Sequence, residues 1–355
     1  MQARPILIND AHSNLKMILP LQHILLFVLL ISLSACQGQS KTNDMNEKAS
    51  TSNPLLCDPE TGVCEVPTNE TSDTPQKIAE VDNKKIRVVY FTDPICSSCW
   101  GIEPQLRKLK LEYGKHIDIE YRMGGLLPDW SYNSGGISKP SDVAHHWDEV
   151  SSHYDMPIDG DVWLEDPLSS SYPPSIAFKA AQLQDEEKAV LFMREIREMV
   201  FLEKKNITKW EHLSTAASKV GLDTGQLKTD FEGKAKTLFK EDLSLAKEFG
   251  VRGFPTMFFI DSLGNKQTVY GSRPYAFYET AILNIQPSIV KSEYHKDWEH
   301  LFAKYSTLTA REFSELSGTP RSQSETQLNE LTKNEKLEMF TTKNGAIWKR
   351  KNTKN

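Results

Sequence analysis

The sequence predicts a mixed α/β domain followed by a small separate module. An apolar, β-prone run at 86–91 passes directly into a helical pattern at two cysteines, Cys96 and Cys99. After a second β-type pattern at 117–123, a long block with mostly helical patterns follows, and β-type patterns return at 253–270. With 355 residues, of which 39% are hydrophobic and 25% charged, the chain can bury a sizeable core in one large domain or two.

The N-terminal residues have the pattern of an export signal. Residues 24–31 are a nearly unbroken apolar run, too short to span a bilayer comfortably but typical of the central region of a signal peptide. The following Leu33-Ser34-Ala35-Cys36 fits a bacterial lipoprotein signal, in which cleavage precedes a cysteine that is then lipidated. An ordinary signal peptide or a buried helix with a chance cysteine is the alternative. We therefore expect residues 1–36 to be a signal, and a protein anchored through Cys36 to the outside of a bacterial membrane.

A polar linker separates this signal from the main domain. Residues 37–83 are rich in Ser, Thr, Asn and Lys and predict a flexible tether. Within it, Asp-Pro and Thr-Gly turns can bring Cys57 and Cys64 together. A structural disulfide is the simplest interpretation of this pair. A dithiol that exchanges with the central cysteines, or half of a metal site, are the alternatives, and the lack of a nearby His weakens the second.

The number of cysteines agrees with export. There are five, and once Cys36 is set aside the other four form two close pairs, as expected in an oxidising compartment. A zinc site built from both pairs is disfavoured because the spacing of Cys57 and Cys64 is unsuitable for zinc ligands. The net charge of −6 argues against a general nucleic-acid binder.

The main domain, about 84–285, shows elements in a definite order. A strand at 86–91 leads into the helix that carries Cys99 and ends near Gly114, and a second strand is predicted at 117–123. A helical insertion spans about 126–250. Its predicted helices lie at 175–183, 186–201, from a capping box at Thr208–Glu211 to Gly221, and across 223–249. A strand opened by Pro255, a turn at 264–265, a partner strand at 267–270 and a helix at 275–285 complete the domain.

Without the helical insertion, this order is that of a thioredoxin fold. In that fold a cis-proline precedes the third strand and packs against the active-site sulfurs, and Pro255 occupies this position. The extended backbone beside it can pair with a substrate peptide. Cys96 falls at the first helical turn, where free N–H groups and the helix dipole favour a thiolate. Cys99, one turn later, can resolve a mixed disulfide on Cys96.

These residues also carry a resemblance to a known family. The segments that carry it are Phe91-Thr92-Asp93-Pro94-x-Cys96-x-x-Cys99-Trp100-Gly101, Gly253-Phe254-Pro255-Thr256, Ser171-Tyr172-Pro173-Pro174-Ser175 and Gly221-Leu222-Asp223. They resemble the DsbA-type thioredoxin-fold oxidoreductases, and most closely the FrnE-like and Spx-adaptor-like branch, over about 84–285.

The resemblance implies a function and roles for single residues. Cys96 would be the nucleophile, Cys99 the resolving cysteine and Pro255 the cis-proline. From their positions beside these residues, Trp100 and Phe254 are expected at the substrate groove. Core packing is an alternative role for Trp100. The clients would be proteins with thiols or disulfides, and a redox partner would reset the dithiol. No cofactor is required.

The pair between the cysteines leaves the direction of the reaction open. Family members more often carry Pro, His, Trp or Gly there, and Ser97-Ser98 departs from that pattern. Because this pair tunes the redox poise, oxidation, isomerisation and reduction of clients all remain possible activities. One branch of the family contains cytosolic adaptors that deliver a transcription regulator to the ClpXP protease. A redox-sensing or protease-adaptor protein is therefore the alternative function.

Other polar residues are weaker candidates. His145, His146 and His153 lie close together in the insertion and could line a cleft or bind a metal, but a solvated helix face explains them more simply. Asp93 could tune the Cys96 thiolate or cap the helix. Glu120 on the second strand could be a proton acceptor for Cys99.

The tail, residues 286–355, predicts a small winged-helix-like appendage. Thr309-Ala310-Arg311-Glu312 is a capping box for a helix that ends at Gly318, and a second helix is predicted from Ser324. Lys343-Asn344-Gly345 between two β-type runs predicts a hairpin. The basic C-terminal end raises nucleic-acid binding as a possibility. Given export, a docking or partner-binding role is the stronger expectation, and no nucleic acid is expected.

Overall fold

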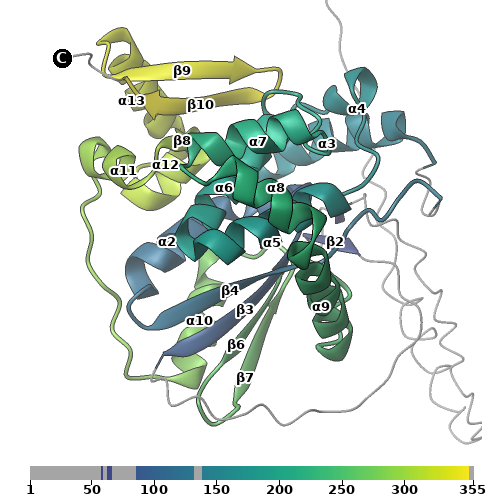
Figure 1. Ribbon diagram of the computed structural model, residues 1–355. Coiled ribbons are helices and arrows are strands. Elements are labelled where there is room, and N and C mark those ends of the chain that lie inside the picture. The colour runs from purple at the N-terminus through teal and green to yellow at the C-terminus, as the bar shows by residue number, and fades with distance from the viewer. Residues whose placement is uncertain (1–56, 59–61, 66–84, 132–137, 352–355) are drawn as a thin grey trace, which may run out of the picture. The chain divides into compact units, whose positions relative to one another are not determined.

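The main sheet has four strands in the order β4–β3–β6–β7 (Figure 1). β3 (Ile86–Thr92) pairs in parallel with β4 (Ile117–Met123) and antiparallel with β6 (Thr256–Ile260), and β6 pairs antiparallel with β7 (Lys266–Tyr270). Nearly all of β3 is buried, which explains why its sequence is mostly apolar instead of alternating, with Arg87 at its one partly exposed position. The order of the strands and helices confirms the predicted fold class.

The computed structural model describes residues 57–58, 62–65, 85–131 and 138–351, and all of them belong to one unit that spans 51–355. The predicted signal at 1–36, with its lipidated Cys36, lies outside the described residues, as does most of the predicted linker. Within the described ranges, no helix combines the length and the apolar character needed to cross a membrane.

Two short helices follow the central strand. α1 (Ser97–Gly101) carries Cys99, and α2 (Glu103–Tyr113) continues after a break at Ile102. The single helix expected here is therefore divided, with Pro104 in the first turn of α2, where its missing N–H has no helical partner to lose. α2 ends at Gly114, as predicted.

Seven helices form the described part of the insertion between β4 and β6, the place that the sequence predicts. They are α3 (Pro140–Tyr154), α4 (Val162–Glu165), α5 (Tyr172–Gln184), α6 (Glu186–Phe201), α7 (Trp210–Lys219), α8 (Thr224–Glu232) and α9 (Lys234–Glu248). α5 packs against α6, α8 and α9, and α9 packs against β4 (Figure 1).

Two details of the insertion differ from the prediction. α5 begins three residues earlier than expected, because Pro173 and Pro174 fit its first turn. The predicted capping box at Thr208 is wrong: the Thr208 hydroxyl donates to Asn206 Oδ1 at 2.6 Å, and α7 begins after Lys209 without a side-chain cap.

After α10 (Tyr275–Ile285), the C-terminal appendage has a second cluster of buried apolar side chains, including Leu301, Phe313 and Trp348. Its elements are α11 (Trp298–Lys304), β8 (Thr307–Thr309), α12 (Ala310–Ser317), α13 (Arg321–Lys333), β9 (Leu337–Thr342) and β10 (Gly345–Arg350). The strands form a sheet in the order β8–β10–β9.

The capping box of Thr309 and Glu312 and the hairpin at 343–345 are present as predicted. α11 and β8 were not predicted, and α13 begins three residues before the expected Ser324, immediately after Pro320.

A third sheet joins the N-terminal cysteine loop to the main domain. β1 (Cys57–Asp58) and β2 (Val63–Glu65) form a hairpin, and β2 pairs antiparallel with β5 (Gly253–Phe254). The predicted turn between the two cysteines therefore places them side by side, with Cys57 directly opposite Cys64 in the register.

Candidate functional site

Cys96 and Cys99 lie at the start of a helix directly after the central strand, as the sequence predicts. Cys96 is the N-cap of α1, with an extended backbone (φ −77°, ψ 110°), and its Sγ accepts a hydrogen bond from the Cys99 N–H at 3.1 Å. Both residues are free thiols and both are fully buried. Their separation of one helical turn suits the formation of a disulfide between them.

The two thiols differ in acidity. Burial, and then the neighbouring Cys99, raise the pKa of Cys96 well above its ordinary value. Burial also opposes ionisation of Cys99, but the hydrogen bond with Cys96 and the charge of Arg197 together lower the pKa of Cys99. In this arrangement burial opposes the thiolate that the sequence predicts on Cys96. The physical reason is that Cys96 is covered by other groups, so the helix terminus cannot compensate for its lost hydration.

Arg197 is a site residue that the sequence did not reveal. It comes from α6, is fully buried, and donates from Nη2 to Thr92 Oγ1 at 2.7 Å and to the Asp93 carbonyl at 3.2 Å. Its Nη1 donates to Glu103 Oε1 at 2.7 Å. Arg197 thus fixes the loop before Cys96 from the side of the insertion. No local pattern identifies it, because its burial depends on elements far apart in the sequence.

Asp93 joins three segments around the motif. Its Oδ1 accepts from the Ile95 N–H at 3.0 Å, and its Oδ2 accepts from the Leu126 N–H at 2.8 Å and the Ser171 hydroxyl at 2.9 Å. Burial raises the pKa of Asp93 to about 6, although these hydrogen bonds favour its charged form. Asp93 does not cap α1, because the N-cap is Cys96. It organises the loop before that helix and attaches the insertion to the loop. Its charge is also one of the smaller causes that raise the pKa of Cys96, after burial and Cys99.

Pro255 lies beside the cysteine loop of the linker. The Phe254–Pro255 peptide bond is cis, the conformation that the sequence predicts. Immediately before it, β5 pairs with β2, and Cys64 lies opposite Phe254 in the register. Cys64 is disulfide-bonded, and the Cys96 S–H points to Cys64 Sγ at 3.3 Å. The site therefore contains a buried dithiol in contact with a sulfur atom of a disulfide.

Comparison with known proteins identifies the family of this chain. The thioredoxin family model matches residues 90–280. Over 306 residues the chain is 35% identical to the ClpXP adapter protein SpxH of Halalkalibacterium halodurans, and the match covers 84% of this chain and 97% of that protein. The chain belongs to the SpxH group of the thioredoxin family.

A second SpxH and a solved structure are also similar to this chain. The SpxH of Bacillus subtilis is 28% identical over 271 residues, which cover 75% of this chain and 89% of that protein. Among solved structures, a candidate protein disulfide isomerase from Nitrosomonas europaea aligns with a TM-score of 0.51 at 20% identity, over 58% of this chain and 100% of that one. This last likeness shows the fold alone.

The two aromatic residues predicted at the substrate groove of this thioredoxin-family site are instead core residues. Trp100 is fully buried, stacks on Phe201 with 5.5 Å between ring centroids, and donates from Nε1 to the Pro157 carbonyl at 3.1 Å. Phe254 is also fully buried, and its ring lies so close to Gly124 that a Cβ there would fall 1.7 Å from Cζ. Only the backbone of Phe254 takes part in strand pairing, so the groove prediction fails for both side chains.

The Ser97-Ser98 pair is buried, and Ser98 lies close to both the sulfurs and the insertion. The Ser98 hydroxyl shares a hydrogen bond with the Tyr154 hydroxyl at 2.6 Å, and its Oγ lies 3.4 Å from Cys64 Sγ. This side chain therefore has a place beside the disulfide, which the sequence could not show.

The remaining polar candidates have other roles. Glu120 forms ion pairs with Arg87 at 2.5 Å and with Arg122 at 2.9 Å. These two charges lower the pKa of Glu120, although burial opposes its ionisation. Glu120 is thus committed to strand-surface ion pairs, which does not support its predicted role as proton acceptor for Cys99.

The histidines of α3 face different surroundings. His145 is exposed and pairs with Glu149, whereas His146 is buried, and the ring of His153 packs edge-on against Tyr154. A solvated helix face therefore describes only part of this group.

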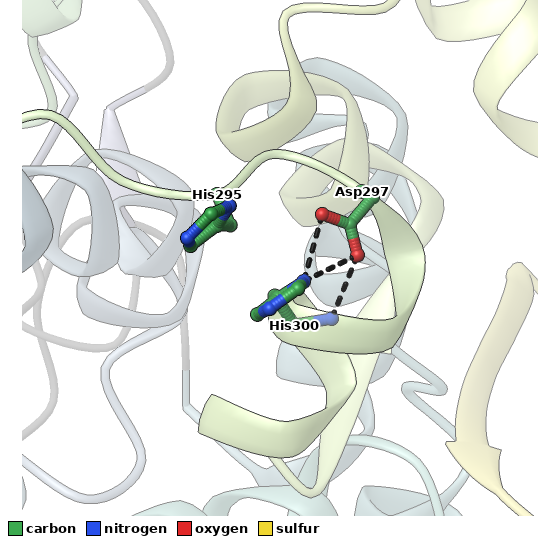
Figure 2. Close-up of side chains that lie close together, drawn as sticks. All are labelled: His295, Asp297 and His300. Atoms are coloured by element: carbon green, nitrogen blue, oxygen red, sulfur yellow. Dashed lines mark hydrogen bonds and ion pairs between the residues drawn. The ribbon is translucent and has the colours of Figure 1, made fainter.

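Among the described residues, one group of side chains could hold a metal ion: His295, Asp297 and His300 (Figure 2). Asp297 is the N-cap of α11 and accepts from the His300 N–H at 3.1 Å and contacts His300 Nδ1 at 2.7 Å. All three side chains are exposed. Helix capping accounts for the positions of Asp297 and His300, and the ring of His295 stacks on that of His300. The group lies in the appendage and not at the thiols.

A buried charge network connects the cysteine motif to the appendage. Arg194 of α6 donates to both carboxylate oxygens of Glu312, at 2.7 and 3.1 Å, and Arg107 of α2 approaches the same carboxylate at 3.2 Å. The Arg194 guanidinium also lies 4.4 Å from the ring centre of Trp100. Glu312 is fully buried. The appendage is thus attached to the motif helices by ion pairs away from water, where unpaired charges are costly.

Proposed function

We propose that this chain carries out thiol–disulfide exchange on protein cysteines through Cys96 and Cys99. The observation that supports this proposal most directly is the pair of free thiols at the start of α1, with Cys96 Sγ 3.3 Å from the sulfur of a disulfide-bonded cysteine. Reacting atoms at about 3–3.5 Å are in the range of a near-attack arrangement. The site thus already contains both reactants of an exchange step.

The reaction needs no cofactor. When the Cys96 sulfur attacks a client disulfide, a mixed disulfide forms and the client releases one thiol. Cys99 then attacks Cys96, which releases the second client thiol and leaves a Cys96–Cys99 disulfide. Two electrons and two protons have passed to the client. The reverse sequence oxidises a client dithiol, and a redox partner resets the pair in either direction.

A trapping experiment tests this activity. Cys99→Ser, in a background of Cys57→Ser and Cys64→Ser, should accumulate mixed disulfides between Cys96 and client proteins, because the resolving thiol is absent. The matched control is Cys96→Ser in the same background, which should trap nothing. If no mixed disulfide forms and the wild-type Cys96/Cys99 pair does not cycle in a glutathione redox buffer, the proposed activity is excluded.

A second candidate function is that of a protease adaptor. Its support is the identity of 35% to a ClpXP adapter protein over 97% of that protein's length. An adaptor binds through surfaces, so Cys96→Ser with Cys99→Ser should leave it intact. Degradation of purified Spx by ClpXP, with and without this double variant, separates the two functions. Acceleration that is independent of the cysteines supports the adaptor, and no acceleration at all excludes it.

The membrane anchor is part of the proposal as well. The support is the apolar run at 24–31 and the small residues before Cys36. Labelled palmitate should be incorporated into the wild-type chain in bacterial cells and not into Cys36→Ser. Wild-type protein found unlabelled in the cytosol would exclude the anchor and favour the adaptor, because ClpXP acts inside the cell.

A further inference from the structure

The N-terminal hairpin occupies the edge at which a client would pair. β2 lies antiparallel to β5, with Glu65 opposite Gly253 and Cys64 opposite Phe254, directly before Pro255. Addition of an extended strand at such an edge is a common way to bind a peptide. In this chain the position is filled by a segment of the chain itself.

The hairpin is held in place from a second side. The Ser272 N–H donates to the Gly62 carbonyl at 2.7 Å, and a Cβ at position 62 would meet Ser272 at 2.7 Å. Gly62 has a φ of +67°, a conformation that disfavours other residues. The turn before β2 therefore packs closely against the loop after β7. This contact fixes Cys64 in its position opposite Phe254.

The sulfur atoms are arranged for reaction inside the chain. Cys64 is disulfide-bonded, its Sγ is 3.3 Å from that of Cys96, and both side chains have no exposed surface. Cys96 and Cys99 are free, so Cys36 and Cys57 are the two remaining cysteines that could be the partner of Cys64. Cys57 lies directly opposite Cys64 in the hairpin register, which makes it the partner that the fold favours.

We propose that the Cys57–Cys64 disulfide is an internal substrate of Cys96, so that the hairpin acts as a disulfide relay. The Cys96 sulfur bonds to Cys64, the Cys57–Cys64 bond breaks, and the Cys96 proton ends on Cys57. Cys99 then bonds to Cys96, and its proton ends on Cys64. The result is a Cys96–Cys99 disulfide and a reduced hairpin, and the same steps in reverse return the electrons.

The relay has a consequence for external clients. In the folded chain the Cys96 sulfur has no exposed surface, and the sulfur of Cys64 lies 3.3 Å from it. The hairpin disulfide is therefore the first disulfide within reach of Cys96, ahead of the disulfide of any external client. This proposal rests on the exchange activity of Cys96 proposed above, and its test must distinguish a failure of the relay from a failure of that activity.

The test uses the full chain with Cys99→Ser, oxidised and then incubated at neutral pH with an alkylating agent. Each attack of Cys96 on Cys64 frees Cys57, which the agent then caps, so the exchange is drawn forward even where its equilibrium is unfavourable. Mass spectrometry of the digested protein should find a peptide pair that joins Cys64 to Cys96, together with alkylated Cys57. The matched control, Cys96→Ser with Cys99→Ser, should keep Cys57 unalkylated.

Either of two results overturns the relay: a hairpin disulfide that survives with Cys57 unmodified, or alkylation of Cys96 without a Cys64–Cys96 bond. The variant Cys57→Ser with Cys64→Ser separates the two proposals, because it keeps Cys96 and Cys99. Suppose that the Cys57→Ser/Cys64→Ser variant reduces insulin or glutathione disulfide, but no Cys64–Cys96 bond forms in Cys99→Ser. The relay then fails and the exchange activity stands. If it reacts with neither, the exchange activity fails too.

Discussion

Asp93 and Arg197 show how single buried residues determine the surroundings of the thiols. The sequence identifies Asp93 because it adjoins the cysteine motif, yet its contacts with Leu126 and Ser171 come from the insertion. Arg197 reaches the same loop from α6. The residues of the cysteine motif are therefore close together in the sequence. The groups that bond to their loop come from the insertion, far away in the sequence.

The raised pKa of Asp93 predicts a component of stability that depends on pH. Burial raises this pKa to about 6 from an ordinary value of 3.8, so between these two values the folded state binds a proton that the unfolded state has lost. The free energy of unfolding contributed by Asp93 therefore falls as the pH rises from about 4 to about 6, by about 3 kcal/mol.

Urea unfolding of the wild type and Asp93→Asn between pH 4 and pH 7 measures this contribution. The difference in the free energy of unfolding between the two proteins should change from about pH 4 to about pH 6 and level off above about pH 6. The matched control is Asp118→Asn, a half-exposed residue on β4 that pairs with Lys85. A constant difference for Asp93→Asn across the whole range would contradict the buried, titrating carboxyl.

At the scale of elements, helix termini with complete local signals are predictable and incomplete ones are not. The Thr309/Glu312 box is present because both side chains bond the backbone of the same turn, at 3.1 and 2.7 Å. The similar pattern at Thr208 fails because Asn206 takes its hydroxyl. A capping motif thus predicts a helix start only where no neighbouring acceptor competes.

Glu312 also connects elements, and its removal should be costly. Glu312→Gln retains the shape of the side chain but removes the charge that faces Arg194 and Arg107, both of which are buried. Breaking one partner of a buried ion pair costs about 3–5 kcal/mol. We expect a loss of that size in the free energy of unfolding, measured by urea denaturation.

A surface pair provides the control for this variant. Glu325 pairs with Arg321 at 2.7 Å, but both side chains are substantially exposed. Glu325→Gln should therefore cost about 1 kcal/mol or less. Equal losses for the two variants would show that burial does not strengthen the Glu312 pairs.

At the scale of the whole molecule, the appendage and the thioredoxin-like domain should unfold together. The appendage has its own apolar core, but its α12 packs on α2 and its Glu312 neutralises arginines of the main domain. Separation would leave those charges buried without partners. Hydrogen exchange in increasing urea should give the same opening free energy for amides of β3 and of β9.

The variant Glu312→Gln tests whether the buried ion pairs cause the two parts to unfold together. Amides of β9 and β10 should then exchange at lower urea concentration than those of β3, because the connection is weakened while each core is unchanged. A wild-type appendage that already opens independently would show that the ion pairs do not couple the two cores.

The sequence by itself determined the elements whose signals are local. The strand at 117–123, the helices at 186–201 and 275–285, and the C-terminal hairpin follow from periodicity, caps and turns within a few residues. The Cys96/Cys99 pair and Pro255 could also be recognised together, because the order of elements brings them to the same edge of a known topology.

Only the tertiary structure decided which groups surround the thiols. Trp100 is a core residue, Arg197 charges the site, and Cys64 meets Cys96 because contacts between distant segments control burial. Burial also raises the pKa of Cys96 for this reason. A helix start favours a thiolate, but full burial opposes it more strongly. Local patterns determine where a side chain stands in its element, and the packing of elements determines whether water or another sulfur lies next to it.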